Sequence, residues 1–129
     1  MKLNLVTGSI LFVCCALAYA QQALVGKYMG SMTTTTPLGG NVVQVGIIID
    51  ITSAENGQLK GTIINTSQVC GGSFASEGTY KENRLRFAMI EGSKVQGCRP
   101  LLFVGAAEGN KLVGKFSWSG GMQDAVFSK

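Results

Sequence analysis

The spacing of glycine is the feature that most constrains the fold of this chain. There are eighteen glycines, and all but Gly8 follow residue 20. The stretches between them are short and rich in Val, Ile, Thr, Phe and Tyr, as is typical of strands. No stretch shows the 3.6-residue apolar period of an amphipathic helix. The sequence therefore predicts an all-β protein with strands at 24–31, 41–52, 58–66, 73–80, 84–91, 101–107, 111–118 and 122–128.

The connections between these strands alternate in kind. Tight turns are expected at 53–57, 81–83 and 108–110, where Asn and Gly supply the positive φ that hairpins need. The other connections, at 32–40, 67–72, 92–100 and 119–121, are longer or richer in glycine. In an up-and-down meander, successive connections lie at opposite ends. We therefore predict an eight-stranded antiparallel up-and-down barrel, whose longer loops gather at one end, which we call the mouth.

Alternation along each strand assigns the side chains to two faces. Six basic residues fall on the outer face: Lys27, Lys60, Arg84, Arg86, Lys111 and Lys115. The inward set is Leu24, Gly26, Tyr28, Val43, Val45, Ile47, Ile49, Ile51, Leu59, Ile63, Leu85, Phe87, Met89, Leu112, Phe116 and Trp118. Eight strands enclose a lumen that side chains can fill, so we expect a packed interior and no deep calyx for a bulky lipid.

The segment 41–52 is apolar on both faces, because Val42 and Ile48 lie on its nominal outer side. An exposed apolar face often marks a partner surface. We therefore expect a homo-oligomer through this strand, with ordinary apolar surface as the alternative.

The first 20 residues have the order of a signal peptide. Lys2 precedes an apolar run, and Ala18-Tyr19-Ala20 fits a small-x-small cleavage site. We predict export to the extracellular space or periplasm, a single mature domain at 21–129, and no membrane span after cleavage. A membrane anchor is the alternative, which the shortness of the run disfavours.

Removal of this segment leaves two cysteines, Cys70 and Cys98. An oxidising compartment makes a disulfide between them the default, and the meander places their two loops at the same end. A free reactive thiol or a metal pair is the alternative, but neither cysteine has a nearby His or second Cys to support it.

The composition removes most site chemistry. Histidine is absent, so we expect no nucleophilic triad, no zinc site and no cofactor. Paired carboxylates could hydrolyse glycosides, but Asp50 and Glu77 are predicted to face outward on separate strands. The 11 Lys and Arg residues are scattered, whereas nucleic-acid binding favours a basic stripe with aromatic platforms. We therefore predict a protein that is not an enzyme and does not bind nucleic acid.

The predicted mouth gathers the candidate binding residues. The methionines Met29, Met32, Met89 and Met122 could form an adaptable apolar rim or a Cu(I) site, or could simply fill gaps. A threonine run at 33–36 opens the first long loop, and Asp124 is expected to point inward as a ligand-orienting acceptor. The predicted ligand-binding residues are Tyr28, Thr33, Thr35, Met89, Arg99, Trp118, Met122 and Asp124. Asn65-Thr66-Ser67 is a glycosylation acceptor sequence if the host is a eukaryote.

Three segments repeat a pattern of apolar, small and apolar residues at alternate positions. They are Leu24-Val25-Gly26-Lys27-Tyr28, Leu59-Lys60-Gly61-Thr62-Ile63 and Leu112-Val113-Gly114-Lys115-Phe116. The first of them, together with the turn Asn56-Gly57 and the strand after it, resembles the corresponding parts of the avidin family. The resemblance implies an eight-stranded meander barrel. It does not imply biotin binding, because Tyr28 stands where avidins carry a tryptophan and Trp118 is the only indole.

These features predict a secreted or periplasmic binding protein that uses the mouth of a disulfide-linked barrel. With a packed lumen we expect a protein partner, as for an inhibitor or effector that inserts a loop into its target. The alternative is an avidin-like or lipocalin-like carrier of a small molecule.

Overall fold

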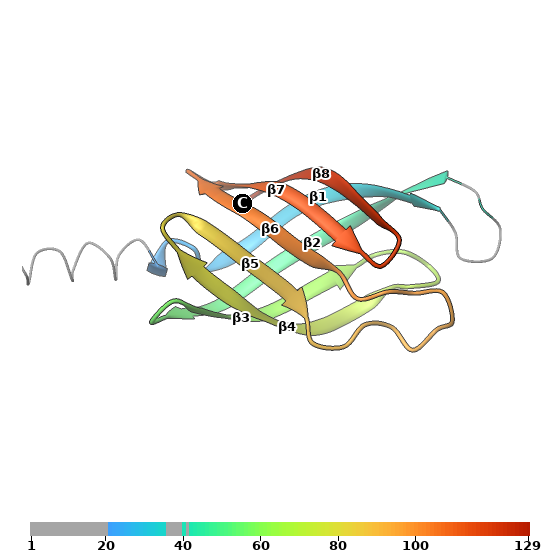
Figure 1. Ribbon diagram of the computed structural model, residues 1–129, viewed down its shortest axis with the longest axis horizontal. Coiled ribbons are helices and arrows are strands. Elements are labelled where there is room, and N and C mark those ends of the chain that lie inside the picture. Colours follow the sequence, from blue (N-terminus) through green and yellow to red (C-terminus); the bar gives the residue numbers. More distant parts are fainter. Residues whose placement is uncertain (1–20, 36–39, 41) are drawn as a thin grey trace, which may run out of the picture.

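The computed structural model describes residues 21–35, 40 and 42–129. Eight strands form a closed barrel in which each pairs antiparallel with the next along the chain (Figure 1). The strands are β1 (Gly26–Thr35), β2 (Val42–Glu55), β3 (Gln58–Asn65), β4 (Gly72–Lys81), β5 (Arg84–Met89), β6 (Leu102–Glu108), β7 (Lys111–Trp118) and β8 (Gly121–Ser128). The predicted all-β meander is confirmed. The predicted signal peptide lies outside the described residues, and none of the described helical residues forms a segment able to cross a membrane.

The tight turns have the backbone that their residues predict. Asn56, Glu82 and Asn83 adopt positive φ, as do Gly57 and Gly109. These turns lie together at one end of the barrel, and the longer loops lie at the mouth. The β1–β2 hairpin extends beyond the other strands at the mouth end (Figure 1).

One predicted boundary was wrong. The segment beginning at Met32 was expected to be a loop, but β1 continues to Thr35, with Thr33 opposite Gln44 and Thr35 opposite Val42. Threonine is β-branched and favours strands, and β2 is long enough to pair with the whole run. The threonines at 33–35 therefore extend a hairpin, and Thr36 lies outside the described residues.

The core confirms the predicted faces. The inward residues predicted from alternation are buried except for Gly26, Val43 and Trp118, which are partly buried, while all six basic residues assigned to the outer face are exposed. The prediction omitted Phe103 and Phe127. Both are fully buried and pack with Phe116, with ring centroids 5.2–5.7 Å apart. This aromatic cluster helps to fill the lumen, as expected for an eight-stranded barrel.

Two of the three repeated glycines, Gly61 and Gly114, lie where neighbouring strands approach each other closely. A Cβ on Gly61 would lie 1.8 Å from the carbonyl oxygen of Asp50, and one on Gly114 would lie 2.1 Å from that of Val104. Each glycine sits between two inward apolar residues of its strand. In these two segments strand-to-strand contact therefore excludes a side chain at the central position, whereas a Cβ on Gly26 would meet the Lys129 side chain, 2.7 Å from its Cε.

The barrel closes through a narrow seam between β1 and β8. A single residue pair, Met29 with Ser128, joins the two ladders. Nearer the mouth, the side chain of Gln123 replaces the ladder: its Nε2 donates to the Thr33 carbonyl (2.9 Å), and its Oε1 accepts from the Thr33 N–H (3.2 Å). The amide side chain thus closes the seam where β1 and β8 diverge.

Candidate ligand-binding cavity at the barrel mouth

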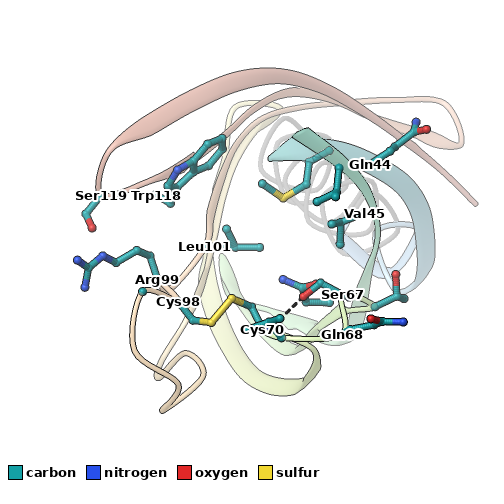
Figure 2. Close-up of a pocket in the computed structure, with 16 residues that line it drawn as sticks. Gln44, Val45, Ser67, Gln68, Cys70, Cys98, Arg99, Leu101, Trp118 and Ser119 are labelled. Atoms are coloured by element: carbon teal, nitrogen blue, oxygen red, sulfur yellow. Dashed lines mark hydrogen bonds between the residues drawn. A yellow bond between two sulfur atoms is a disulfide. The ribbon is translucent and has the colours of Figure 1, made fainter. Parts of the chain in front are cut away.

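The mouth of the barrel encloses a cavity of about 480 Å³. Its lining comes from the mouth ends of β1, β2, β3 and β7 and from the loops that carry Cys70 and Cys98. Figure 2 shows these residues arranged around an open centre. The expected packed interior is present in the core, where Phe103, Phe116 and Phe127 pack together, and the cavity lies at the mouth end.

The floor and one side of the cavity are apolar. Met32, Val45 and Leu101 are buried inward-facing residues that line it. Trp118, at the end of β7, is partly buried against the core and lines the same space. An apolar or aromatic group could be buried here with a favourable transfer free energy.

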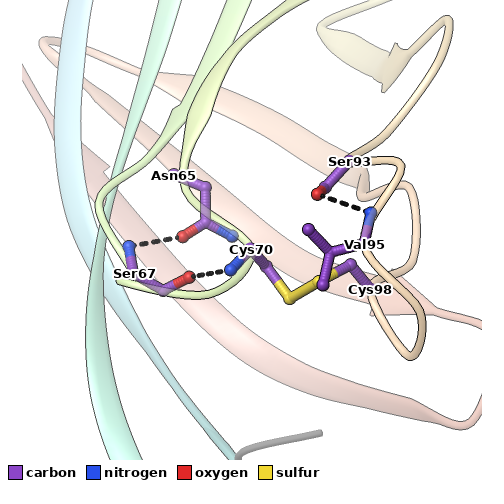
Figure 3. The surroundings of a disulfide bond; sticks show 6 residues. All are labelled: Asn65, Ser67, Cys70, Ser93, Val95 and Cys98. Carbon is purple, nitrogen blue, oxygen red and sulfur yellow. Dashed lines mark hydrogen bonds between the residues drawn. A yellow bond between two sulfur atoms is a disulfide. The ribbon is translucent and has the colours of Figure 1, made fainter.

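The opposite wall is polar and is organised by two local hydrogen bonds (Figure 3). The backbone N–H of Ser67 donates to Asn65 Oδ1 (2.9 Å), and the backbone N–H of Cys70 donates to Ser67 Oγ (2.9 Å). Asn and Ser commonly form such side-chain-to-backbone bonds in turns. These bonds hold the loop after β3 in a fixed conformation beside the cavity.

A disulfide joins this loop to the loop after β5. Cys70 and Cys98 are bonded, with their Cα atoms 5.6 Å apart, which confirms the predicted pairing. In the second loop, the Cys98 N–H donates to the Val95 carbonyl (3.1 Å) and the Val95 N–H donates to Ser93 Oγ (3.2 Å). The covalent bond therefore connects two segments that both line the cavity and restrains their separation.

The rim of the cavity carries a positive charge from Arg99. Among the described lining residues, Arg99 is the only charged one. Figure 2 shows that its side chain, like that of Gln44, points away from the open centre. The nearby loop charges Glu91 and Lys94 are paired with each other (3.6 Å). Arg99 therefore contributes positive potential at the rim.

The predicted binding residues separate into groups. Arg99 and Trp118 line the cavity, whereas Met89 is buried outside its lining and Met122 is exposed on the outer surface. Thr33 is exposed, and its backbone is used by the seam. The side chain of Thr35 is outside the described residues.

Tyr28 does not lie at the mouth, contrary to prediction. Its ring is buried, and its hydroxyl donates to the Leu24 carbonyl (2.8 Å). The prediction placed it too near the mouth because β1 was expected to end at residue 31. Since the strand continues to Thr35, Tyr28 belongs to the part of the core nearer the tight turns.

The predicted inward orientation of Asp124 was also wrong. Its side chain is 89% exposed and lies 3.8 Å from Lys115 Nζ on the outer surface. Ala125 and Phe127 face the core instead. Both sets of alternate positions in β8 contain apolar residues, and the larger apolar group, the Phe127 ring, determines which set is buried.

The four methionines do not converge. Met32 and Met89 are buried inside the barrel, and Met29 and Met122 are exposed outside it. The alternative of a Cu(I) site built from three or more of these thioethers is therefore contradicted.

The prediction missed Asn65 and Ser67 as cavity residues. Asn65 was considered only as a glycosylation acceptor. The signal was nevertheless present, because the inward alternation of Leu59 and Ile63 along β3 continues to Asn65. The register agrees, since Asn65 pairs with the inward-facing Ile47.

Comparison of the chain with protein-family models, curated proteins and solved structures finds no match. The class of protein is therefore defined here by the structure itself: an eight-stranded antiparallel barrel with a disulfide-restrained cavity at its mouth.

Proposed function

We propose that this protein is an exported, non-enzymatic binding protein that takes a small molecule into the cavity at the barrel mouth. The observation that carries the proposal is the cavity of about 480 Å³. Small-molecule sites typically have volumes of about 300–1,000 Å³ and combine apolar lining with a few placed polar groups. The floor of Met32, Val45 and Leu101 and the wall of Asn65 and Ser67 fit that description.

This proposal reverses the order of the two functions expected from the sequence. The packed lumen expected from the sequence favoured a protein partner or a ligand bound at the surface. A concave, partly apolar cavity suits a compact ligand better than an inserted loop, because it can surround most of a small molecule. The carrier function also agrees with the resemblance of the sequence to the avidin family, although the ligand proposed here is not biotin.

The disulfide supports export. Such bonds persist in extracellular and periplasmic compartments and are rare in the reducing cytosol. The bond between Cys70 and Cys98 restrains the two loops beside the cavity, so it would hold a binding site partly formed before the ligand arrives. Pre-organisation of this kind reduces the entropic cost of binding.

The proposal can be tested by filling the cavity. Val45→Phe would add a ring inside it, and Val104→Phe would add the same ring on the exposed outer face of β6. A panel of small aromatic and aliphatic compounds should include some that raise the melting temperature and change Trp118 fluorescence. We expect Val45→Phe to abolish both responses and Val104→Phe to keep them. Equal responses in the two variants, or none in the unmodified protein, would contradict the proposal.

Binding of a protein partner is the second candidate. Val69, Ile90 and Val95 are exposed on the loops at the mouth. Apolar side chains on neighbouring loops are typical of interaction surfaces. A partner that binds the unmodified protein and Val45→Phe equally, but not a Val69→Lys, Val95→Lys variant, would favour this function over the first.

A further inference from the structure

The polar wall of the cavity has a consistent hydrogen-bonding character. Asn65 continues the inward face of β3, opposite Ile47 of β2 and Gly72 of β4. Ser67 follows it in the loop that leads to Cys70. Both side chains line the cavity, so they are the polar groups that a bound molecule would meet on this side.

The acceptor atoms of these two side chains are already engaged. Asn65 Oδ1 accepts from the Ser67 N–H, and Ser67 Oγ accepts from the Cys70 N–H. Each bond uses an oxygen of the side chain and leaves its hydrogens available. The bond to Oδ1 also fixes the orientation of the Asn65 amide, as Figure 3 shows, with Nδ2 on the opposite side from the Ser67 N–H.

Asn65 Nδ2 is accessible as a donor. Within the described part of the chain it donates to no other residue, and no buried side-chain nitrogen or oxygen there lacks a partner. Without a partner there, Nδ2 is not a buried atom, and it belongs to a residue that lines the cavity. The hydroxyl hydrogen of Ser67 is a second donor, since a hydroxyl that accepts one bond can still donate.

The charges at the mouth also favour a ligand group that accepts hydrogen bonds. Among the described lining residues there is no carboxylate, and Arg99 supplies positive potential at the rim. A ligand donor or cation would meet side-chain oxygens that each already accept one hydrogen bond. An acceptor oxygen would find oriented N–H and O–H groups.

We infer that the cavity selects a ligand whose apolar body carries a hydrogen-bond acceptor oxygen, a carbonyl or carboxylate, held by Asn65 Nδ2 with the Ser67 hydroxyl beside it. This inference rests on the function proposed above. In the bound state the apolar body contacts Met32, Val45, Leu101 and Trp118, and the acceptor oxygen faces β3. Asn65 is then the residue that determines specificity.

The test uses a pair of probes that differ in one acceptor: 2-acetylnaphthalene, which has a ketone oxygen, and 2-ethylnaphthalene, which has none. Asn65→Asp keeps an oxygen for the Ser67 N–H and removes the Nδ2 donor. Gln44→Glu is the matched control, because it places the same added charge at the mouth on a side chain that points away from the centre (Figure 2). Affinities of the disulfide-bonded protein and its variants for both probes would be measured by equilibrium dialysis.

We expect the unmodified protein to prefer the ketone. Asn65→Asp should weaken ketone binding about tenfold, as for the loss of one buried hydrogen bond, and change hydrocarbon binding less than about twofold. Gln44→Glu should leave both affinities within about twofold. Equal weakening of both probes by Asn65→Asp, or equal affinity of the unmodified protein for them, would overturn the inference. Failure of both probes to bind the unmodified protein would count against the proposed function as well.

Discussion

At the scale of single residues, Tyr28 shows how a polar group can be buried in this core at little cost. Its ring is buried, and its hydroxyl donates to the Leu24 carbonyl at 2.8 Å. Lys129 Nζ lies 5.3 Å from the ring centroid and donates to the Ala23 carbonyl. Tyr28 thus contacts both Leu24, near the start of the described chain, and Lys129, its last residue.

Removing the hydroxyl of Tyr28 should destabilise the barrel. In Tyr28→Phe the Leu24 carbonyl loses its buried donor, and the free energy of unfolding should fall by about 1–2 kcal/mol. Denaturant unfolding would measure the change. Tyr80→Phe, which alters a partly buried tyrosine that contributes no hydroxyl hydrogen bond within the described structure, should cost less, and an equal cost would argue against this role for the Tyr28 hydroxyl.

The same variant should alter the alkaline limit of stability. Burial raises the pKa of Tyr28, because the phenolate loses hydration. The part of the folding stability that comes from the protonated, buried Tyr28 is therefore fully present below about pH 10, where tyrosine in the unfolded chain titrates. It is lost as pH rises from there to the folded pKa, since the unfolded chain releases the proton first. Between these limits the stability of Tyr28→Phe should fall less steeply with pH than that of the unmodified protein, and parallel curves would contradict the prediction.

Residue orientation was predictable wherever one face of a strand was clearly more apolar than the other. β5 met this condition, because Arg84 and Arg86 alternate with Leu85 and Phe87, and its inward residues were assigned correctly. β8 did not, because Met122 and Val126 compete with Ala125 and Phe127 for the inner face. The orientation of Asp124 therefore depended on how Phe127 packs with Phe103 and Phe116, a contact between distant segments that the local pattern does not contain.

At the scale of strands, close approach of backbones constrains the sequence as strongly as burial does. A Cβ at Gly61 would overlap the Asp50 carbonyl oxygen, whereas one at Gly46 would meet the Thr66 hydroxyl at 3.0 Å. The Thr66 side chain is exposed and can move, at the cost of the hydrogen bond that its hydroxyl donates to the Gly46 carbonyl (3.0 Å). The Asp50 carbonyl belongs to the backbone of β2 and cannot rotate away. An alanine at position 61 therefore fits only if β2 moves away from β3.

We therefore expect Gly61→Ala to reduce the free energy of unfolding by about 1–3 kcal/mol, the range for overpacked sites. Gly46→Ala, the matched control, should reduce it by no more than about 1 kcal/mol, the value of one hydrogen bond, because only the Thr66 side chain has to move. Chemical denaturation of the two variants would decide, and equal effects would show that the strand spacing is not limiting.

The disulfide acts on two loops at once. It closes a segment with a sequence separation of 28, which corresponds to about 3–4 kcal/mol in the chain-entropy model. A Cys70→Ala, Cys98→Ala variant should unfold at correspondingly lower denaturant concentration. It should also lose affinity for cavity ligands even at temperatures where it is folded, because the two lining loops are no longer joined. Full retention of binding would show that the loops are held by their hydrogen bonds alone.

At the scale of the whole molecule, the order of the strands and the side of each loop were predictable because turn residues and alternation agree along most of the chain. The cavity was not. Its existence depends on where the large side chains stop, with Phe103, Phe116 and Phe127 packed together and Val45 and Leu101 lining the space at the mouth. The sequence shows which residues point inward, but the volume that they leave empty is a property of their joint packing.

An apolar patch lies on the outer surface of the barrel, across β8, β1, β2 and β3. Met29, Ile48 and Ile64 occupy neighbouring register positions on β1, β2 and β3 and face outward. Met29 is 62% exposed, and Val126 on the adjacent β8 is 52% exposed. One side of this apolar patch carries Lys27 beside Asp50, and the other carries Lys115 beside Asp124. Because each border has both charges, two copies of the patch can meet without like-charge repulsion.

We propose that this patch mediates self-association, as the apolar outer face of the segment 41–52 first indicated. Sedimentation velocity of the unmodified protein should show a dimer whose fraction rises with concentration. Met29→Lys would place a charge in the centre of the patch and should shift the equilibrium to monomer by about tenfold or more, the effect of burying an uncompensated charge. Thr79→Lys, on the exposed face of β4 beside Gln58 at the tight-turn end of β3, should leave the equilibrium unchanged. A monomer at all concentrations would show that the patch is ordinary apolar surface.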